Sequence, residues 1–303
     1  MKIVYMGTPD FAVLPLRAMK EAGYEVAAVV TQPDKPKGRG KTMLPTPVKE
    51  EAVSLGIPVY QPAKVREPEF QEILKGIAPD LIVVAAFGQI IPKTILTLPR
   101  FGCINIHASL LPKYRGAAPI QQAVIDGEKE SGVTIQKMGE GLDTGDMISK
   151  EVVVLSKEET GGDLLVKTLP SIFDGTAVYE KQPEESPTPY AAMITKQMGL
   201  LDFTKSAEVL ERLVRGLNPW PSAYTFLNGK TLKVWKSRVG EEKGSALPGT
   251  VVKTDKNGIH VACCDKTLIL EEIQLEGKKR MDADAFLRGY PVEAGTKFSD
   301  KKE

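Results

Sequence analysis

The stretch DLIVVAAFG, residues 80–88, is a nearly unbroken apolar run that ends in glycine. A run of this length without polar alternation is typical of a strand buried on both faces of a sheet. Similar runs recur along the first half of the chain, at residues 2–7, 25–31 and 102–107, with helical patterns between them. This alternation predicts an α/β domain with a Rossmann-like parallel sheet covered by helices on both faces.

The last third of the chain has a different pattern. KSAEVLERLVRGL, residues 205–217, predicts one amphipathic helix, and short alternating strands follow it. Asn228-Gly229 and Asn257-Gly258 lie between such strands, and this dipeptide favours type I′ hairpins. We therefore expect a second domain that is a small OB-like antiparallel β-barrel. The proline- and charge-rich segment before it indicates a boundary, so we predict a catalytic domain at 1–182, a linker at 183–204 and the barrel at 205–303.

Composition restricts the class of protein. The chain has 303 residues and a net charge of +1, and residues 204–303 carry 18 Lys and Arg against 14 Asp and Glu. No apolar run is long enough to cross a bilayer, and the first residues do not resemble a signal peptide. The three cysteines show no CxxC spacing, which argues against a disulfide framework and a structural zinc site. We expect a cytoplasmic protein without a metal.

The segment QPDKPKGRGK, residues 32–41, is strongly basic. Lys35, Lys37, Arg39 and Lys41 stand against one acidic residue, and two prolines and two glycines predict a mobile irregular loop. The loop follows the second predicted strand, and ligands of open α/β sheets bind at the carboxyl ends of strands. The residues alone leave two interpretations open, a solvated loop or a loop that contacts phosphates. The GTPDFA turn after the first strand lacks the GxGxxG spacing, which argues against a dinucleotide site and a dehydrogenase.

Asn105 and His107 end the strand GCINIH, and His107 is one of only two histidines in the chain. Strand alternation places the two side chains on the same face. Three glycines bracket Asp143 and Asp146 in GEGLDTGDM, residues 139–147, which predicts either a simple turn or a loop that brings a carboxylate to a ligand. An amide, an imidazole and a carboxylate on neighbouring strand ends can stabilise an oxyanion and carry a proton in acyl transfer.

The motifs NIHASLLPKYRGAAPIQ, residues 105–121, and GVTIQKMGEGLDTGDM, residues 132–147, resemble the folate-dependent formyltransferase family. The resemblance implies 10-formyltetrahydrofolate as formyl donor and a catalytic set of Asn105, His107 and Asp143. It also implies that the folate lies against two segments, the loop after the strand and the apolar run at 82–88. The residues implied in folate binding are Ser109, Leu110, Leu111, Pro112, Phe87 and Gly88.

The segments GTPDFA, TQPDKPKGRGK and NPWP and the predicted barrel are similar to family members that act on tRNA. This similarity implies formylation of the amino group of methionine on charged initiator tRNA. We further expect a monomer with no membrane or DNA partner. The similarity also implies that the basic residues 35, 37, 39 and 41 contact the tRNA. The alternative within the family is a nucleotide-linked amino sugar as acceptor, which would not require the basic loop. A non-catalytic RNA-binding protein is the alternative from another class.

Overall fold

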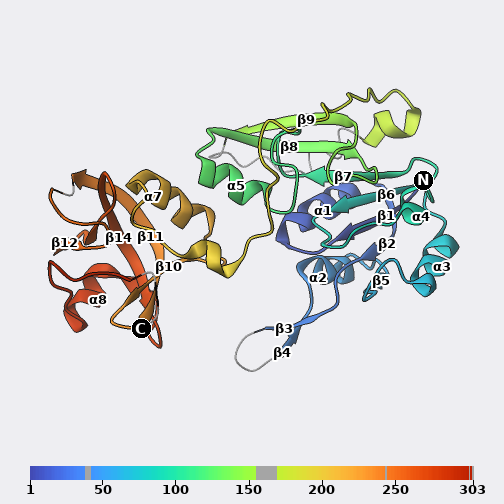
Figure 1. Ribbon diagram of the computed structural model, residues 1–303. Helices are drawn as coiled ribbons and strands as arrows, with labels where there is room; N and C mark the ends of the chain where they lie inside the picture. The colour runs from blue at the N-terminus through green and yellow to red at the C-terminus, as the bar shows by residue number, and fades with distance from the viewer. Residues whose placement is uncertain (38–41, 155–168, 243, 300, 302–303) are drawn as a thin grey trace. The chain divides into compact units, whose positions relative to one another are not determined.

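The computed structural model describes residues 1–37, 42–154, 169–242, 244–299 and 301 (Figure 1). The described chain divides into two compact units. The first comprises Met1–Pro119 and Lys129–Ala191, and the second comprises Ile120–Glu128 and Ala192–Glu303. The predicted linker at 183–204 is thus divided between the units, and a short segment from the first half of the sequence belongs to the second unit.

Seven strands of the described first unit form one sheet, in the order β5-β2-β1-β6-β7-β8-β9. Five of them, β5, β2, β1, β6 and β7, are parallel; β8 then pairs antiparallel with β7, and β9 pairs antiparallel with β8. This mostly parallel sheet confirms the predicted Rossmann-like α/β class. The strands are β1 (Lys2–Gly7), β2 (Glu25–Val30), β5 (Val59–Tyr60), β6 (Leu81–Ala85), β7 (Cys103–His107), β8 (Glu130–Lys137) and β9 (Met147–Val154).

Helices cover both faces of this sheet because β1 is apolar on both. Ile3 and Tyr5 pack into one buried cluster with α1 (Val13–Glu21) and α2 (Pro47–Ser54). The alternate residues of β1 pack into the opposite cluster with α3 (Pro68–Ile77) and α4 (Lys93–Leu96). Alternation of side chains along the strand accounts for the two cores. Because β1, β2, β6 and β7 are parallel, their carboxyl ends meet at one edge of the sheet.

The basic segment differs from the prediction of an irregular loop. Residues Lys35–Lys37 form β3, and Thr42–Leu44 form β4, its antiparallel partner. Figure 1 shows this hairpin extending away from the sheet. Both strands of a two-stranded ribbon are edges, where proline is tolerated, so Pro36 does not prevent the pairing with Met43.

The second unit contains an antiparallel sheet of six strands within its described residues, in the order β10-β11-β14-β13-β12 with β15 beside β14. Its hydrophobic core lies between this sheet and the helices α7 (Ala207–Gly216) and α8 (Ala283–Gly289). The short helices η2 (Lys196–Gly199) and, from Ile120 on, α5 (Pro119–Asp126) also belong to the unit. The strands are β10 (Ala223–Leu227), β11 (Lys230–Glu242), β12 (Val251–Asp255), β13 (Gly258–Ala262), β14 (Lys266–Leu275) and β15 (Met281–Asp282).

The C-terminal segment Gly295–Ser299 closes this sheet. Ser299 forms a bridge with Phe226 of β10, and Lys297 forms a bridge with Thr250, just before β12. The two outer strands of the sheet are therefore joined through one short segment, as barrel closure requires. The sequence pattern assigned no role to this segment.

Candidate active site

The pairing of β7 with β8 gathers polar side chains on one face of the sheet. Asn105 lies directly opposite Gln136, and His107 lies opposite Thr134. Residues that face each other across an antiparallel pair project to the same side. Three of these side chains are buried, and Asn105 is partly exposed. The sheet thus presents an amide and an imidazole side by side at the end of β7.

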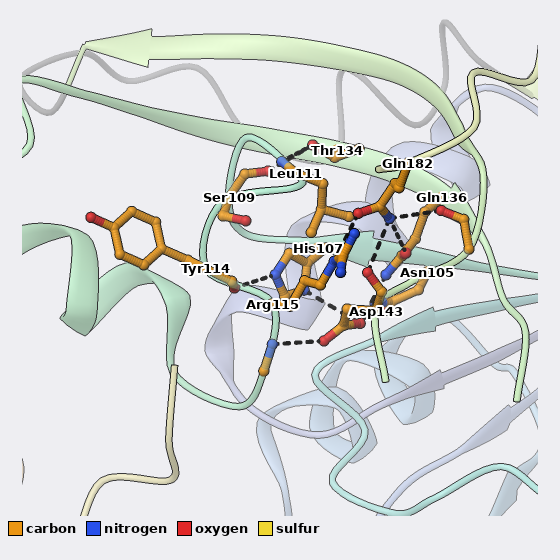
Figure 2. A network of polar contacts seen from close by, with 12 residues as sticks. Asn105, His107, Ser109, Leu111, Tyr114, Arg115, Thr134, Gln136, Asp143 and Gln182 are labelled. Atoms are coloured by element: carbon orange, nitrogen blue, oxygen red, sulfur yellow. Dashed lines mark hydrogen bonds and ion pairs between the residues drawn. The ribbon is translucent and has the colours of Figure 1, made fainter. Parts of the chain in front are cut away.

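Asp143, from the glycine-rich loop between β8 and β9, joins them (Figure 2). Its Oδ1 accepts a hydrogen bond from Asn105 Nδ2 at 3.2 Å and lies 3.6 Å from His107 Nδ1. Its Oδ2 accepts from the backbone N–H of Gly116 at 3.0 Å. The three residues expected to converge therefore do so, and the carboxylate is only 12% exposed.

The other nitrogen of the His107 ring faces a backbone carbonyl. His107 Nε2 lies 2.9 Å from the carbonyl oxygen of Tyr114, and Figure 2 shows the Tyr114 ring pointing away from the site. A carbonyl oxygen can only accept, so Nε2 carries the hydrogen. Nδ1, the nitrogen toward Asp143, then carries a hydrogen only when the ring is positively charged.

Both neighbours of His107 have a left-handed backbone conformation. Tyr114 has a φ of 57° and Asp143 a φ of 52°. For residues other than glycine such a conformation costs about 1–3 kcal/mol and persists only where surrounding contacts hold it. Next to Asp143, a Cβ at Gly145 would lie 1.7 Å from the carbonyl oxygen of Lys137. Glycine at position 145 is therefore a steric requirement of the loop.

The loop predicted to bind folate is held by hydrogen bonds within the loop and to β8. Ser109 Oγ donates to the Lys113 carbonyl at 2.6 Å. Thr134 Oγ1 donates to the Ser109 carbonyl and accepts from Leu111 N–H, at 2.7 and 3.1 Å. Ser109 and Leu111 are buried, whereas Leu110 and Pro112 are partly exposed. The role of these four residues in folate binding remains a prediction.

Phe87 and Gly88 lie in the loop after β6, at the same edge of the sheet. The Phe87 side chain is buried in the core, and its carbonyl accepts hydrogen bonds from Thr8 Oγ1 and Gln32 Nε2 at 2.9 and 3.2 Å. The loops after β1, β2 and β6 are thereby tied together. Farther along the same loop, Ile90 is 91% exposed, an apolar side chain open to a ligand. Folate contact by Phe87 and Gly88 remains a prediction.

The basic hairpin is anchored at its base. Lys49 Nζ of α2 and Gln61 Nε2 each donate to the Asp34 carboxylate at 2.6 Å. These hydrogen bonds, that from Lys49 first, lower the pKa of Asp34. Lys35 is exposed beside this anchor, and the backbone of Lys37 continues β3. Arg39 and Lys41 lie outside the described residues, and the tRNA contact of all four residues remains a prediction.

Sequence reasoning missed three buried polar residues around Asp143. Gln136 Nε2 donates to Asp143 Oδ1 at 2.8 Å. Gln182 Nε2 donates to the Asp143 carbonyl at 3.0 Å, and Arg115 Nε donates to Gln182 Oε1 at 3.0 Å. Polar residues at alternate positions of the otherwise apolar β8 were a usable signal for Gln136 and Thr134. Nothing local indicated Gln182, because its contacts cross 39 and 67 residues of sequence.

A hollow of about 550 Å³ lies elsewhere in the first unit and contains none of the predicted site residues. Gly102, Phe101 and Met138 line it near the beginning of β7. His107 ends the same strand, four residues after Cys103, so it lies roughly 13 Å along β7 from the end of the strand near the hollow, at 3.3 Å per residue. The hollow is separate from the site described above.

Comparison with known proteins assigns the family. The formyl transferase profile matches residues 1–170, and the profile of the formyl transferase C-terminal domain matches residues 193–291. A methionyl-tRNA formyltransferase of Agathobacter rectalis is 55% identical over 310 residues, with 99% of this chain and 100% of that protein covered.

Two solved structures share the fold. The methionyl-tRNA formyltransferase from Clostridium thermocellum superposes with a TM-score of 0.56 at 19% identity, covering 82% of this chain and 96% of that one. An N-formyltransferase from Helicobacter canadensis, in complex with folinic acid and dTDP-3-aminofucose, gives a TM-score of 0.63 at 19% identity, covering 93% and 100%. At such identities the structures support the fold alone. Since both profiles match in order and the A. rectalis protein aligns from end to end, this chain belongs to the formyl transferase family.

Proposed function

We propose that the protein transfers a formyl group from 10-formyltetrahydrofolate to the amino group of methionine on charged initiator tRNA. The observation that carries the chemistry is the convergence of Asn105, His107 and Asp143 at the carboxyl end of β7. The acceptor is supported by full-length identity of 55% to a methionyl-tRNA formyltransferase. The structural relative bound to an aminosugar nucleotide is only 19% identical, so an amino sugar is the weaker acceptor.

The folate derivative supplies an N-formyl carbon that an amine can attack. Asn105 Nδ2 has a second hydrogen beyond the one donated to Asp143, and it can donate to the carbonyl oxygen where negative charge develops. His107 Nδ1 adds a donor when the ring is charged. Asp143 fixes both groups and is the acceptor for the proton that leaves the attacking amine. When the tetrahedral intermediate collapses, the bond between the formyl carbon and the folate nitrogen breaks, and that proton passes to the folate nitrogen, so tetrahydrofolate leaves. Such preorganised donors act strongly where little water reaches them, and the side chains of His107 and Asp143 are only 6% and 12% exposed.

The donor side of the site fits a folate. The loop after β6 presents the exposed Ile90 at the same edge of the sheet as the polar groups, which supports binding of an apolar ring system next to a carbonyl group. The related N-formyltransferase of H. canadensis holds folinic acid. We infer that Ser109, Leu110, Leu111, Pro112, Phe87 and Gly88 form the folate contacts, mostly through backbone and apolar surface.

Binding of a tRNA would give a role to the second unit and to the basic hairpin. We infer that residues 1–182 carry catalysis and that the barrel at 205–303 binds the tRNA with the basic residues Lys35, Lys37, Arg39 and Lys41. Positive charge on a projecting ribbon suits a phosphate backbone. No helix among the described residues combines the length and apolar character needed to cross a bilayer. We infer that the protein acts in the cytoplasm, where translation supplies its acceptor.

A formyl-transfer assay tests the function. The purified protein is incubated with 10-formyltetrahydrofolate and either charged initiator tRNA, charged elongator tRNA or an aminosugar nucleotide. We expect formylation of initiator tRNA and about a 100- to 1000-fold lower turnover for Asn105→Ala and for His107→Ala. Modification of the sugar nucleotide alone would overturn the acceptor, and near-normal turnover of either variant would overturn the site.

A further inference from the structure

The segment Gln182–Thr188, here called the strap, is bonded to the site, although residues 183–188 were predicted to begin a linker. Gln182 is 6% exposed. Its Nε2 donates to the carbonyl oxygens of Asp143 and Gly145 at 3.0 and 2.7 Å. One side chain thus holds the backbone on both sides of Thr144, in the loop that carries the catalytic carboxylate.

The other end of the strap holds the second neighbour of His107. Thr188 Oγ1 accepts a hydrogen bond from the Tyr114 N–H at 2.7 Å. The carbonyl of the same Tyr114 accepts from His107 Nε2. Between these ends, Ser186 Oγ donates to the Pro112 carbonyl at 2.8 Å. The strap therefore contacts the backbone of both residues that face the imidazole.

Arg115 holds the strap through three hydrogen bonds. Its side chain is 2% exposed, and its guanidinium donates to Gln182 Oε1, to the Pro183 carbonyl and to the Glu184 carbonyl at 3.0, 2.7 and 3.2 Å. A guanidinium buried in this way needs its donors satisfied. Arg115 follows Tyr114 directly in the chain. The residue that holds the strap is therefore next to the residue whose carbonyl contacts His107.

We propose that Gln182 and Thr188 are positioning residues, which hold Asp143 and Tyr114 in their left-handed conformations and thereby fix both neighbours of the His107 ring. The physical reason is that neither conformation is favourable for its residue and each has a strap hydrogen bond on its own backbone. Among the described residues, Gln182 and Thr188 bond to the backbone of Asp143 and Tyr114 and not to the catalytic side chains, and Gln182 Nε2 also lies 3.4 Å from Gln136 Oε1. The inference rests on the proposed function, because the orientation of the His107 ring affects kcat only if His107 takes part in formyl transfer.

The expected kinetic effect falls on kcat. Misplacement of a reacting group by about 1 Å costs on the order of 100-fold in rate. Thr188→Val removes the acceptor for Tyr114 N–H, and Gln182→Met removes the donors to the Asp143 loop at similar side-chain volume. We expect kcat to fall about 10- to 100-fold in each, with the KM of folate and of tRNA within about threefold.

Two matched variants separate positioning from general damage. Thr188→Ser keeps the hydroxyl and should restore kcat to within about threefold of the unmodified protein. Glu185→Gln changes an exposed residue of the strap and should leave both constants unchanged. Thermal melting of all four variants identifies any that does not fold, and Thr188→Val and Thr188→Ser carry the test if Gln182→Met is such a variant.

A spectroscopic measurement reports the geometry without any substrate. Selective ¹⁵N-histidine labelling gives signals from only two rings, and His260→Gln assigns them. In the unmodified protein the neutral His107 ring should carry its hydrogen on Nε2, with a hydrogen-bonded proton signal. Thr188→Val should shift or broaden that signal, and Thr188→Ser should retain it.

The outcomes are distinguishable. An unmodified protein that forms no formylmethionyl-tRNA contradicts the proposed function, whatever the spectra show. Normal kcat together with an unchanged His107 signal in both Thr188→Val and Gln182→Met overturns the positioning role. A rise in KM alone also overturns it, because that result would place the strap in substrate binding.

Discussion

Gly216, the last residue of α7, lies directly against Ile125 of α5. A Cβ built at Gly216 would come within 2.7 Å of Ile125 Cγ1 and 3.2 Å of the Gln121 carbonyl oxygen. On the same helix pair, Arg212 Nε donates to the Ile125 carbonyl at 3.0 Å. These contacts explain why residues 120–128 belong to the second unit although residues 1–119 before them and 129–191 after them belong to the first.

The first prediction concerns this helix contact. Gly216→Val should destabilise the protein by about 1–3 kcal/mol, because the added side chain overpacks the α5–α7 contact. Gly76→Ala is the matched control, since that helical position has nothing within 4 Å of an added Cβ. It should stabilise by up to about 1 kcal/mol through helix propensity. Urea unfolding curves measure both changes, and equal stability of the two variants would contradict the contact.

The second prediction concerns the Asp143 carboxylate. Asp143→Asn keeps the shape but turns an acceptor of three hydrogen bonds into a group that competes with Asn105, Gln136 and Gly116 as donor. Loss of a proton acceptor and of the charge beside His107 should lower kcat about 100- to 10,000-fold. Glu140→Gln changes an exposed position of the same loop, and its kcat should stay close to that of the unmodified protein. Single-turnover formylation measures both rates, and comparable rates would remove Asp143 from the mechanism.

The third prediction concerns the base of the basic hairpin. Asp34→Asn weakens the anchor to Lys49 and Gln61, so we expect a higher Kd for initiator tRNA and an unchanged KM for folate. Glu50→Gln makes the same charge change at an exposed position of α2 and should not alter the Kd. Filter-binding titration at fixed salt is the measurement, since phosphate contacts depend on ionic strength.

The same anchor has a defined pH dependence. The pKa of Asp34 is lowered from its ordinary value of 3.8 by the hydrogen bonds from Lys49 and Gln61. A lowered pKa in the folded state stabilises at pH values above the ordinary pKa, and the stabilisation is lost as pH falls through the lowered pKa. The Tm difference between the unmodified protein and Asp34→Asn should thus be constant from pH 7 to about pH 5 and shrink below pH 3.8.

The fourth prediction concerns closure of the barrel. Phe298 is 4% exposed, and its ring centroid lies 6.1 Å from that of Phe203. Phe298→Ala should cost about 3–5 kcal/mol, as for other buried aromatic side chains. The neighbouring exposed Lys297→Gln should change stability by less than about 0.5 kcal/mol. Calorimetry that finds the two variants equally stable would show that the segment does not close the core.

The fifth prediction concerns the thiols. Burial raises the pKa of Cys103 and of Cys263 to about 12, so both are protonated and shielded at neutral pH, whereas Cys264 is exposed. A disulfide reagent attacks the thiolate. In native protein it should label one thiol rapidly, and Cys264→Ser should abolish that fast phase. Three thiols should react in denaturant. Rapid labelling of two thiols in the native state would contradict the buried positions.

Much of the fold followed from short-range patterns. The apolar runs became β1, β2, β6 and β7, and the Asn228-Gly229 turn has the two positive φ values, 48° and 70°, that a type I′ hairpin needs. The second hairpin formed, but its turn lies one residue earlier, at Lys256 and Asn257. There the Asp255 carboxylate accepts from Asn257 N–H at 2.8 Å, and Gly258 begins β13 with a φ of 137°. A side-chain contact displaced the expected turn.

The candidate site was predictable only in part. Alternation placed Asn105 and His107 on one face, and the glycines around Asp143 marked a loop able to approach them. The partners of these groups depend on strand register and on the path of distant loops. Gln136 faces Asp143 because it pairs with Asn105, and Gln182 reaches the same loop from a segment whose prolines and charges indicated an exposed linker.

The amino-acid sequence by itself determined the class of fold, and it indicated the end of β7 as the candidate site with the amide, imidazole and carboxylate that meet there. These follow from periodicities and turn preferences that operate within a few residues. The tertiary structure decided which backbone carbonyl faces His107, how the strap holds Asp143 and Tyr114, and which segment closes the barrel. Those contacts use main-chain groups common to every residue, so only the folded path of the chain selects the partners.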